Sequence, residues 1–191
     1  MTKKKKAKEF KLGLFGYEIA FSFNKEDRDK GAKFLGAMLV LFFALNFLFS
    51  LPLIGIEYVI ASIVSFVLNL FGIANATAFE EPALILIHNI DVPIAISYLC
   101  TGILETALLV AAIATSFGIS TKKRLLGIAG AIAGIQLFNL FRILTTIFLI
   151  INFNLEVAEL GHELLFRLFL LIVIAGFYSL WFFWATKKET K

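Results

Sequence analysis

The stretch Tyr98-Leu-Cys-Thr-Gly-Ile-Leu-Glu105 lies where a segment flanked by polar residues turns into a long, predominantly apolar run. It contains the only cysteine of the 191-residue chain. A single cysteine excludes an internal disulfide, so Cys100 is either packing material or a chemically active thiol. The choice between these two roles depends on the segments around Cys100. Composition and charge predict what those segments are.

The chain as a whole is too apolar for a soluble domain of its size. Hydrophobic residues make up 60% of it and charged residues 17%, and 22 residues are Phe. This composition is typical of a protein whose solvent is the bilayer. We expect one transmembrane domain over 34–186, a basic arm over 1–33 and a basic tail over 187–191. No small-residue cleavage site closes the apolar region after Gly31, so a cleaved signal peptide is not expected.

The positive charges are confined almost entirely to three clusters. All but two of the 18 Lys and Arg residues lie in 1–33, 122–124 and 187–191, whereas 74–98 and 152–162 contain acidic residues and no Lys or Arg. Cytoplasmic loops of membrane proteins carry an excess of Lys and Arg, so both termini are predicted to be cytoplasmic. The two acidic segments are then predicted to lie outside the cell membrane. A cytoplasmic anchor accounts for the basic arm, and no nucleic-acid partner is expected.

This charge distribution predicts an all-α polytopic membrane protein with about four full spans. Roughly 20 apolar residues are needed to cross the hydrocarbon core. The spans are expected at 34–51, 100–117, 125–151 and 163–184. The third contains Gly127, Gly130 and Gly134, which are expected to let a neighbouring helix approach closely.

Segment 54–73 is also long enough to span, but a span there would move the acidic segment 74–98 to the cytoplasmic side. We therefore expect an amphipathic helix in the outer leaflet. The alternative is a true span in a protein of five or six spans with an external N-terminus, which the N-terminal lysine run opposes. A stripe of small and polar residues follows one face of this helix: Glu57, Ala61, Ser65 and Asn69.

Two segments predict β-structure. Residues 82–98 are rich in β-branched residues and contain two prolines, which is typical of a small hairpin, here on the outer side and directly before Cys100. In the basic arm, large apolar residues alternate with smaller or polar ones over 15–23, which predicts a short strand or hairpin.

Three chemically active side chains are expected at one depth. Cys100 opens the second span from the outside, and His162 opens the last. Arg142 lies 17 residues after Leu125, which is about 25 Å along a helix, in a hydrocarbon core about 30 Å thick. Asn139 is one turn before Arg142, so this helix face is polar and is expected to face the bundle interior. All three side chains are thus predicted in the outer half of the membrane.

Each of these residues also has a purely structural interpretation. Cys100 can be packing material in an apolar helix. Arg142 can stabilise the bundle by pairing with Glu105, and His162 can cap a helix or sit at the interface. Convergence at one depth favours a shared chemical role.

One other residue is an alternative to His162 as the proton-transferring group. His88, the only other histidine, lies in the predicted hairpin. Arg167 follows Glu163 by four residues, an ordinary ion-pair spacing on a helix, which favours a purely structural interpretation of this arginine.

A cysteine, an arginine and a histidine in contact suit acyl transfer. A free thiol has a pKa of about 8.5, and it is mostly protonated at neutral pH. A nearby guanidinium lowers that pKa, and an imidazole can accept the proton. The same guanidinium can stabilise the oxyanion of a tetrahedral intermediate. Spacing alone leaves transfer to an amine and hydrolysis by water equally open.

Three short motifs on consecutive predicted helices resemble the exosortase/archaeosortase family. They are Cys100-Thr-Gly-Ile, Asn139-Leu-Phe-Arg142 and Gly161-His162-Glu163, and the resemblance covers roughly residues 35–185. It implies sortase-like chemistry in a helical membrane protein without the sortase β-barrel. The short chain without an appended domain favours the archaeal branch.

The resemblance also implies roles and partners. Cys100 would be the nucleophile, Arg142 the oxyanion and thiolate partner, and His162 the general acid and base. Some members of that family have Arg in place of the His, which makes Arg167 an alternative to His162. The supporting residues are expected to be Asn139, Glu105, Thr101, Gly102, Arg167 and His88. The substrates would be membrane-anchored proteins with a C-terminal signature, a transmembrane helix and a basic tail, and the acceptor a membrane lipid or glycan. The substrate's helix is expected against the glycine face of 127–134. No metal site or cofactor is expected, since one Cys and two separated His make no ligand cluster.

A membrane cysteine protease that releases its product to water and a non-enzymatic small transporter or assembly factor are the alternative functions.

Overall fold

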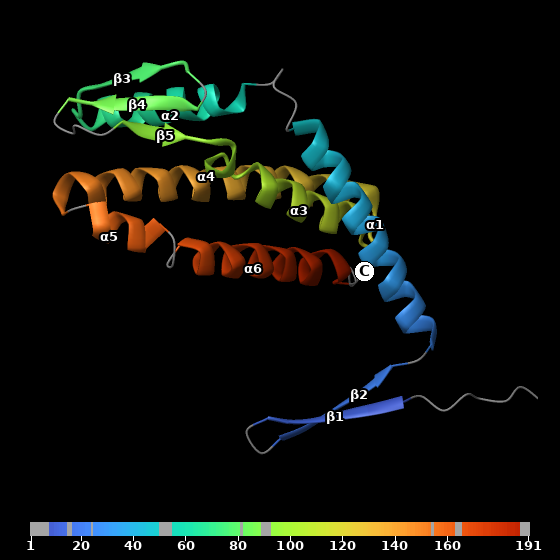
Figure 1. Ribbon diagram of the computed structural model, residues 1–191. Coiled ribbons are helices and arrows are strands. Elements are labelled where there is room, and N and C mark those ends of the chain that lie inside the picture. Colours follow the sequence, from blue (N-terminus) through green and yellow to red (C-terminus); the bar gives the residue numbers. More distant parts are fainter. Residues whose placement is uncertain are drawn as a thin grey trace, which may run out of the picture.

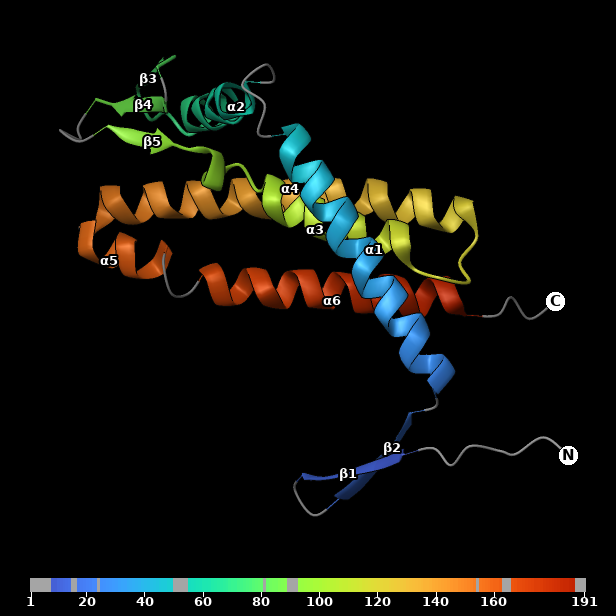
Figure 2. The same cartoon turned by 45° about the vertical axis from the view of Figure 1, so that its right-hand side comes forward.

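A computed structural model describes residues 8–14, 17–23, 25–49, 55–80, 82–88, 93–153, 155–162 and 166–187. Within them, three helices are long and apolar enough to cross a membrane. They are α1 (Lys25–Phe49), α4 (Thr121–Asn152) and α6 (Phe166–Thr186). Figure 1 shows α4 and α6 running alongside each other, and Figure 2 shows α1 crossing them obliquely.

The outer surfaces of these helices are apolar. Phe47 on α1 is 73% exposed and Phe183 on α6 is 76% exposed, and many Leu and Ile side chains are exposed beside them. Such a surface suits lipid rather than water. The expected helical fold with membrane-length apolar helices is thus confirmed, while the number and direction of the spans stay predictions.

Helix α1 begins at Lys25, not at residue 34 as the hydropathy pattern predicts. Glu26 and Asp27 occupy its first turn, where carboxylates interact favourably with the helix dipole. Lys30 pairs with Glu26 across one turn at 2.9 Å. Hydropathy registers only the apolar part of a helix, so the charged first turns were missed.

Two helices are shorter than a span. Helix α2 (Ile56–Leu70) has 15 residues and α3 (Ile103–Thr115) has 13. At 1.5 Å per residue they are about 20 Å long, against a hydrocarbon core of about 30 Å. The prediction that a helix begins at Cys100 is wrong, because a 3₁₀ turn, η1 (Tyr98–Cys100), precedes α3.

The predicted hairpin over 82–98 is present as β4 (Ala83–Ile87) and β5 (Ile94–Ile96), in an antiparallel pair. An unpredicted strand, β3 (Asn75–Ala78), pairs with the other side of β4, so the sheet order is β3-β4-β5. Asn75 meets the polar stripe of α2: Ser65 Oγ donates to Asn75 Oδ1 at 2.5 Å, and Asn75 Nδ2 donates to Asn69 Oδ1 at 3.0 Å. The stripe therefore fixes α2 to the sheet.

A first core lies between this sheet, α2 and the second half of α4. Its buried side chains are Ala61, Val64, Leu68, Ala83, Ile85, Ile87, Ile96, Ile143 and Ile147. A separate hairpin of β1 (Lys8–Leu14) and β2 (Tyr17–Phe23) precedes α1, in agreement with the β-structure predicted for the arm.

A second core joins α3, α4 and α6, with Trp181 of α6 packed onto Gly127 of α4. Trp181 Nε1 donates to the Lys123 carbonyl at 3.1 Å. Phe177 covers Gly130 and Gly134. The glycine face thus admits a neighbouring helix as expected, but that helix is α6, and the expectation that a substrate helix packs there is wrong.

Candidate cysteine site

Cys100 lies at the end of η1, between β5 and α3 and outside the three candidate spans. The Cys100 amide donates to the Ser97 carbonyl at 2.8 Å, and the Thr101 amide donates to the Tyr98 carbonyl at 3.1 Å. Thr101 is fully buried, and its hydroxyl donates to the same Tyr98 carbonyl at 2.6 Å. These bonds fix the position of the thiol with respect to the sheet.

Helix α4 holds the same turn from its other side. Asn139, which is buried, donates through Nδ2 to the Cys100 carbonyl at 2.9 Å. Gly102 has φ 72° and lies so close to Asn139 that an added Cβ would be 3.1 Å from the Asn139 Cβ and Cγ. Glycine is required at this position both for its positive φ and for the close approach. Asn139 and Gly102 therefore hold the turn that contains Cys100 against α4.

His162 reaches Cys100 from a third part of the chain. It lies in the π turn that follows the short helix α5 (Leu155–Leu160). A hydrogen bond with His162 is the largest of the effects that lower the pKa of the Cys100 thiol to about 7. Hydrogen bonds with Ser97 and the charge of Arg142 lower this pKa further, while burial raises it. A substantial fraction of the thiol is therefore ionised at neutral pH.

Arg142 is buried on α4, only 6% exposed. Its Nε has no hydrogen-bond partner among the described residues. A buried donor without a partner costs about 1–3 kcal/mol, and more when it is charged. In the described part of the chain Arg142 forms no ion pair with Glu105, and the Glu105 Oε2 atom is itself buried without a partner. The interpretation of Arg142 as half of a bundle-stabilising pair with Glu105 therefore loses its support.

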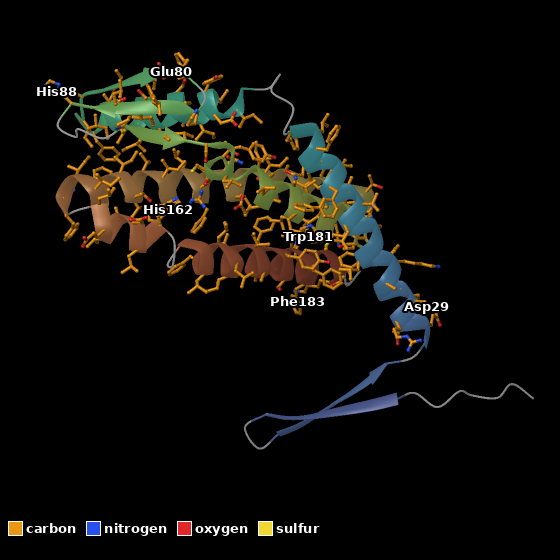
Figure 3. The ribbon with its side chains drawn as sticks, viewed as in Figure 1. Asp29, Glu80, His88, His162, Trp181 and Phe183 are labelled. Atoms are coloured by element: carbon orange, nitrogen blue, oxygen red, sulfur yellow. The ribbon has the colours of Figure 1, made fainter. Side chains whose placement is uncertain are left out.

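The structure separates His88 from this cluster. His88 is exposed at the end of β4, where it borders a pocket beside Asn75 and Leu86. Figure 3 shows it at the tip of the sheet, away from His162. Arg167 falls within α6, but its side chain lies outside the described residues.

Ser97 was not predicted from sequence. Its hydroxyl lies 3.5 Å from the Cys100 Sγ, and the two groups can share a hydrogen bond. The Tyr98 hydroxyl donates to Asn46 of α1 at 2.8 Å and so ties the turn to α1. Next to the turn, Gln136 of α4 donates to the Thr106 hydroxyl of α3 at 3.2 Å. Ser97 stands three residues before the cysteine at the start of a turn, and that position is the only sequence signal that could have pointed to it.

The arrangement provides an ionisable thiol, an imidazole beside it and a buried guanidinium close enough to act electrostatically. Among the described residues no group of three His, Cys, Asp or Glu side chains could hold a metal ion. Comparison with protein-family models, curated proteins and solved structures finds no match for this chain. The resemblance to exosortases and archaeosortases therefore rests on the motifs and stays a prediction.

Proposed function

We propose that this chain is a membrane-embedded, sortase-like cysteine transpeptidase with Cys100 as its nucleophile. The observation that carries the proposal is the meeting of Cys100, His162 and Arg142 from three segments of the chain around one thiol of lowered pKa. Groups whose pKa is perturbed by specific neighbours cluster at functional sites, and this is the only cysteine of the chain. The three motifs that resemble the exosortase/archaeosortase family give the reaction class.

The first half of the reaction forms a thioester. His162 accepts the thiol proton, and the Cys100 sulfur attacks the carbonyl carbon of the scissile peptide bond. The negative charge that develops on the carbonyl oxygen is stabilised by Arg142. The carbon–nitrogen bond then breaks, and His162 returns the proton to the leaving amine. The substrate's membrane-anchoring tail departs as this amine.

The second half releases the acyl group. A nucleophile on a membrane lipid or glycan loses its proton to His162 and attacks the thioester carbonyl. The carbon–sulfur bond breaks, and the thiolate is restored or reprotonated by His162. Water in place of this nucleophile would give hydrolysis by the same steps, and the enzyme would then be a protease.

The positive-inside rule supports an outer location for the site. The basic clusters at 1–33, 122–124 and 187–191 favour the cytoplasmic side, which leaves the three-stranded sheet and Cys100 on the outer side of the cell membrane. A substrate with an apolar helix and a basic tail would insert in the same orientation. Its cleavage point, just outside that helix, would then lie at the depth of Cys100.

The test is processing of a membrane-anchored reporter by the full chain in lipid vesicles. The reporter carries a C-terminal tail taken from proteins of the same cell, with an extended segment, an apolar helix and a lysine cluster. Cys100→Ala is expected to abolish processing, and Arg142→Ala and His162→Ala to reduce it at least 100-fold. His88→Ala is the matched control and is expected to process normally. Processing by Cys100→Ala at the wild-type rate would refute the proposal.

Product mass separates transfer from hydrolysis, because transfer adds the mass of an acceptor and hydrolysis leaves a free carboxylate. One observation favours a non-enzymatic alternative. Arg142 Nε has no hydrogen-bond partner among the described residues, and such a donor suits an anion or lipid headgroup. A transporter or assembly factor of that kind would tolerate Cys100→Ser and lose function in Arg142→Ala.

A further inference from the structure

Strand β5 lies at one edge of the sheet and leads directly into the cysteine turn. In the order β3-β4-β5, only β4 has a strand on both sides. β5 ends at Ile96, Ser97 follows, and η1 carries Cys100 three residues later. Whatever pairs with the outer edge of β5 is therefore guided toward the thiol.

The hydrogen bond from the His88 amide to the Ala74 carbonyl, at 3.1 Å, fixes which backbone groups of β4 face which neighbour. In an antiparallel pair, bonded and non-bonded residue pairs alternate. The backbone N–H and C=O groups of residues 84 and 86 in β4 therefore point toward β3, while those of residues 83 and 85 point toward β5.

The same alternation carries over to β5. Ile94 is opposite Ile85 and Ile96 is opposite Ala83, so these two residues of β5 bond to β4. Ala95 lies between them, and its amide and carbonyl consequently point away from β4. Its side chain is exposed. In the part of the chain that the structure describes, no strand pairs with this edge of β5. The edge thus offers a donor and an acceptor from Ala95, and Ser97 extends it toward the thiol.

We propose that this edge binds an extended segment of the polypeptide substrate as a fourth strand and so delivers the scissile bond to Cys100. The inference rests on the proposed function and names its substrate-binding mode. Pairing through the backbone is largely independent of side chains, and pockets along the strand then give specificity.

The reach along the strand agrees with this assignment. Two residues of a strand advance about 6.6 Å, so Ser97 lies about 6.6 Å beyond Ala95. The Ser97 hydroxyl is 3.5 Å from the Cys100 Sγ. An added strand lies about 4.8 Å from its neighbour. The carbonyl that reacts is thus about two residues along the substrate from the one paired with Ala95.

The occupant is a peptide and not a second copy of this chain. The edge has only three residues in β5, and short edge strands are a common device against sheet-to-sheet association between folded proteins. Because the edge of β5 ends beside the Cys100 thiol, it suits an extended substrate segment whose peptide bond is to be cleaved.

Proline substitution tests whether the substrate pairs with the backbone at the outer edge of β5. Ala95→Pro removes the outward amide and places a methylene in its way, yet proline is tolerated in edge strands where its nitrogen faces outward. Thr77→Pro makes the same change on the opposite edge, since Thr77 of β3 is also in a non-bonded position. Reporter processing is expected to fall about tenfold or more in Ala95→Pro and to stay at the wild-type level in Thr77→Pro. The alkylation profile of Cys100 checks that each variant keeps the folded site.

A second measurement needs no catalysis. A benzophenone side chain is introduced at position 95 or 77 of the Cys100→Ala protein, and photocrosslinking to the tail reporter is measured. Crosslinking is expected from position 95 and not from position 77. If position 95 gives no crosslink, or if the two positions crosslink equally, the proposed binding of the substrate as a fourth strand is wrong. If Ala95→Pro processes like wild type while Cys100→Ala is inactive, the binding mode is wrong and the proposed function stands. If Cys100→Ala remains active, the proposed function is wrong, and crosslinking alone decides the binding mode.

Discussion

Removing His162 should raise the pKa of Cys100 and thereby reduce its reactivity at neutral pH. The wild-type pKa is about 7, and the hydrogen bond with His162 is the largest contribution to its lowering. At pH 7 about half of a thiol with this pKa is thiolate, compared with about 3% for a free thiol of pKa 8.5. In His162→Ala the effect of burial, which raises the pKa, is opposed only by Ser97 and Arg142. We expect the midpoint to rise above pH 8 and the reaction rate at pH 7 to fall about tenfold.

The chain offers a direct assay, because Cys100 is its only cysteine. The rate of alkylation by iodoacetamide is followed by intact mass in detergent between pH 5 and 10. The sign follows from the lowered pKa: thiolate is present above about pH 7 and is lost as the pH falls below it. The midpoint is the decisive quantity, because the intrinsic nucleophilicity of a thiolate falls with its pKa and partly offsets the rate.

His88→Ala is the matched control, since it removes the other histidine of the chain, which lies at the far end of the sheet. Its midpoint should equal that of the wild type. The reasoning fails if His162→Ala keeps a midpoint near 7, or if both histidine variants shift equally.

Three further substitutions test how the site and the helices are held. Asn139→Ala removes the bond to the Cys100 carbonyl and should cost about 1–2 kcal/mol in thermal unfolding, with slower alkylation of the less well-positioned thiol. Gly102→Ala should destabilise by at least about 1–2 kcal/mol, because φ is 72° and the new methyl group meets Asn139. Gly127→Ala should lower the melting temperature strongly, because its Cβ would overlap the Trp181 indole and displace it from the Lys123 carbonyl.

Two glycines serve as controls for these substitutions. Gly72 has φ 74° and nothing within 4 Å of an added Cβ, so Gly72→Ala measures backbone strain without the contact. A Cβ at Gly134 would be 3.5 Å from Phe177, an ordinary contact, so Gly134→Ala should be nearly neutral. If Gly102→Ala proved no worse than Gly72→Ala, the close packing on Asn139 would have no energetic role.

The helices and the hairpin of this chain could be predicted because each rests on local pattern. Long apolar runs predict α4 and α6. Apolar and β-branched residues on either side of Pro93 predict β4 and β5. Strand β3 was missed because its sequence, Asn75-Ala-Thr-Ala78, has no strand pattern of its own. It is held by Asn75, which bonds to α2, and by pairing with β4, and neither interaction is visible in a local window.

The site divides in the same way. The sequence predicts Cys100, Arg142 and His162 at a similar depth in the membrane. This prediction is possible because polar side chains are rare in apolar segments and stand out there. Depth cannot show that Asn139 bonds to the backbone of the cysteine turn, since this depends on how closely α4 approaches η1. That approach is possible only because Gly102 has no side chain. A sequence motif of cysteine, any residue and glycine thus encodes two requirements at once: a thiol that can be ionised, and a turn small enough to seat it on the helix that carries Arg142.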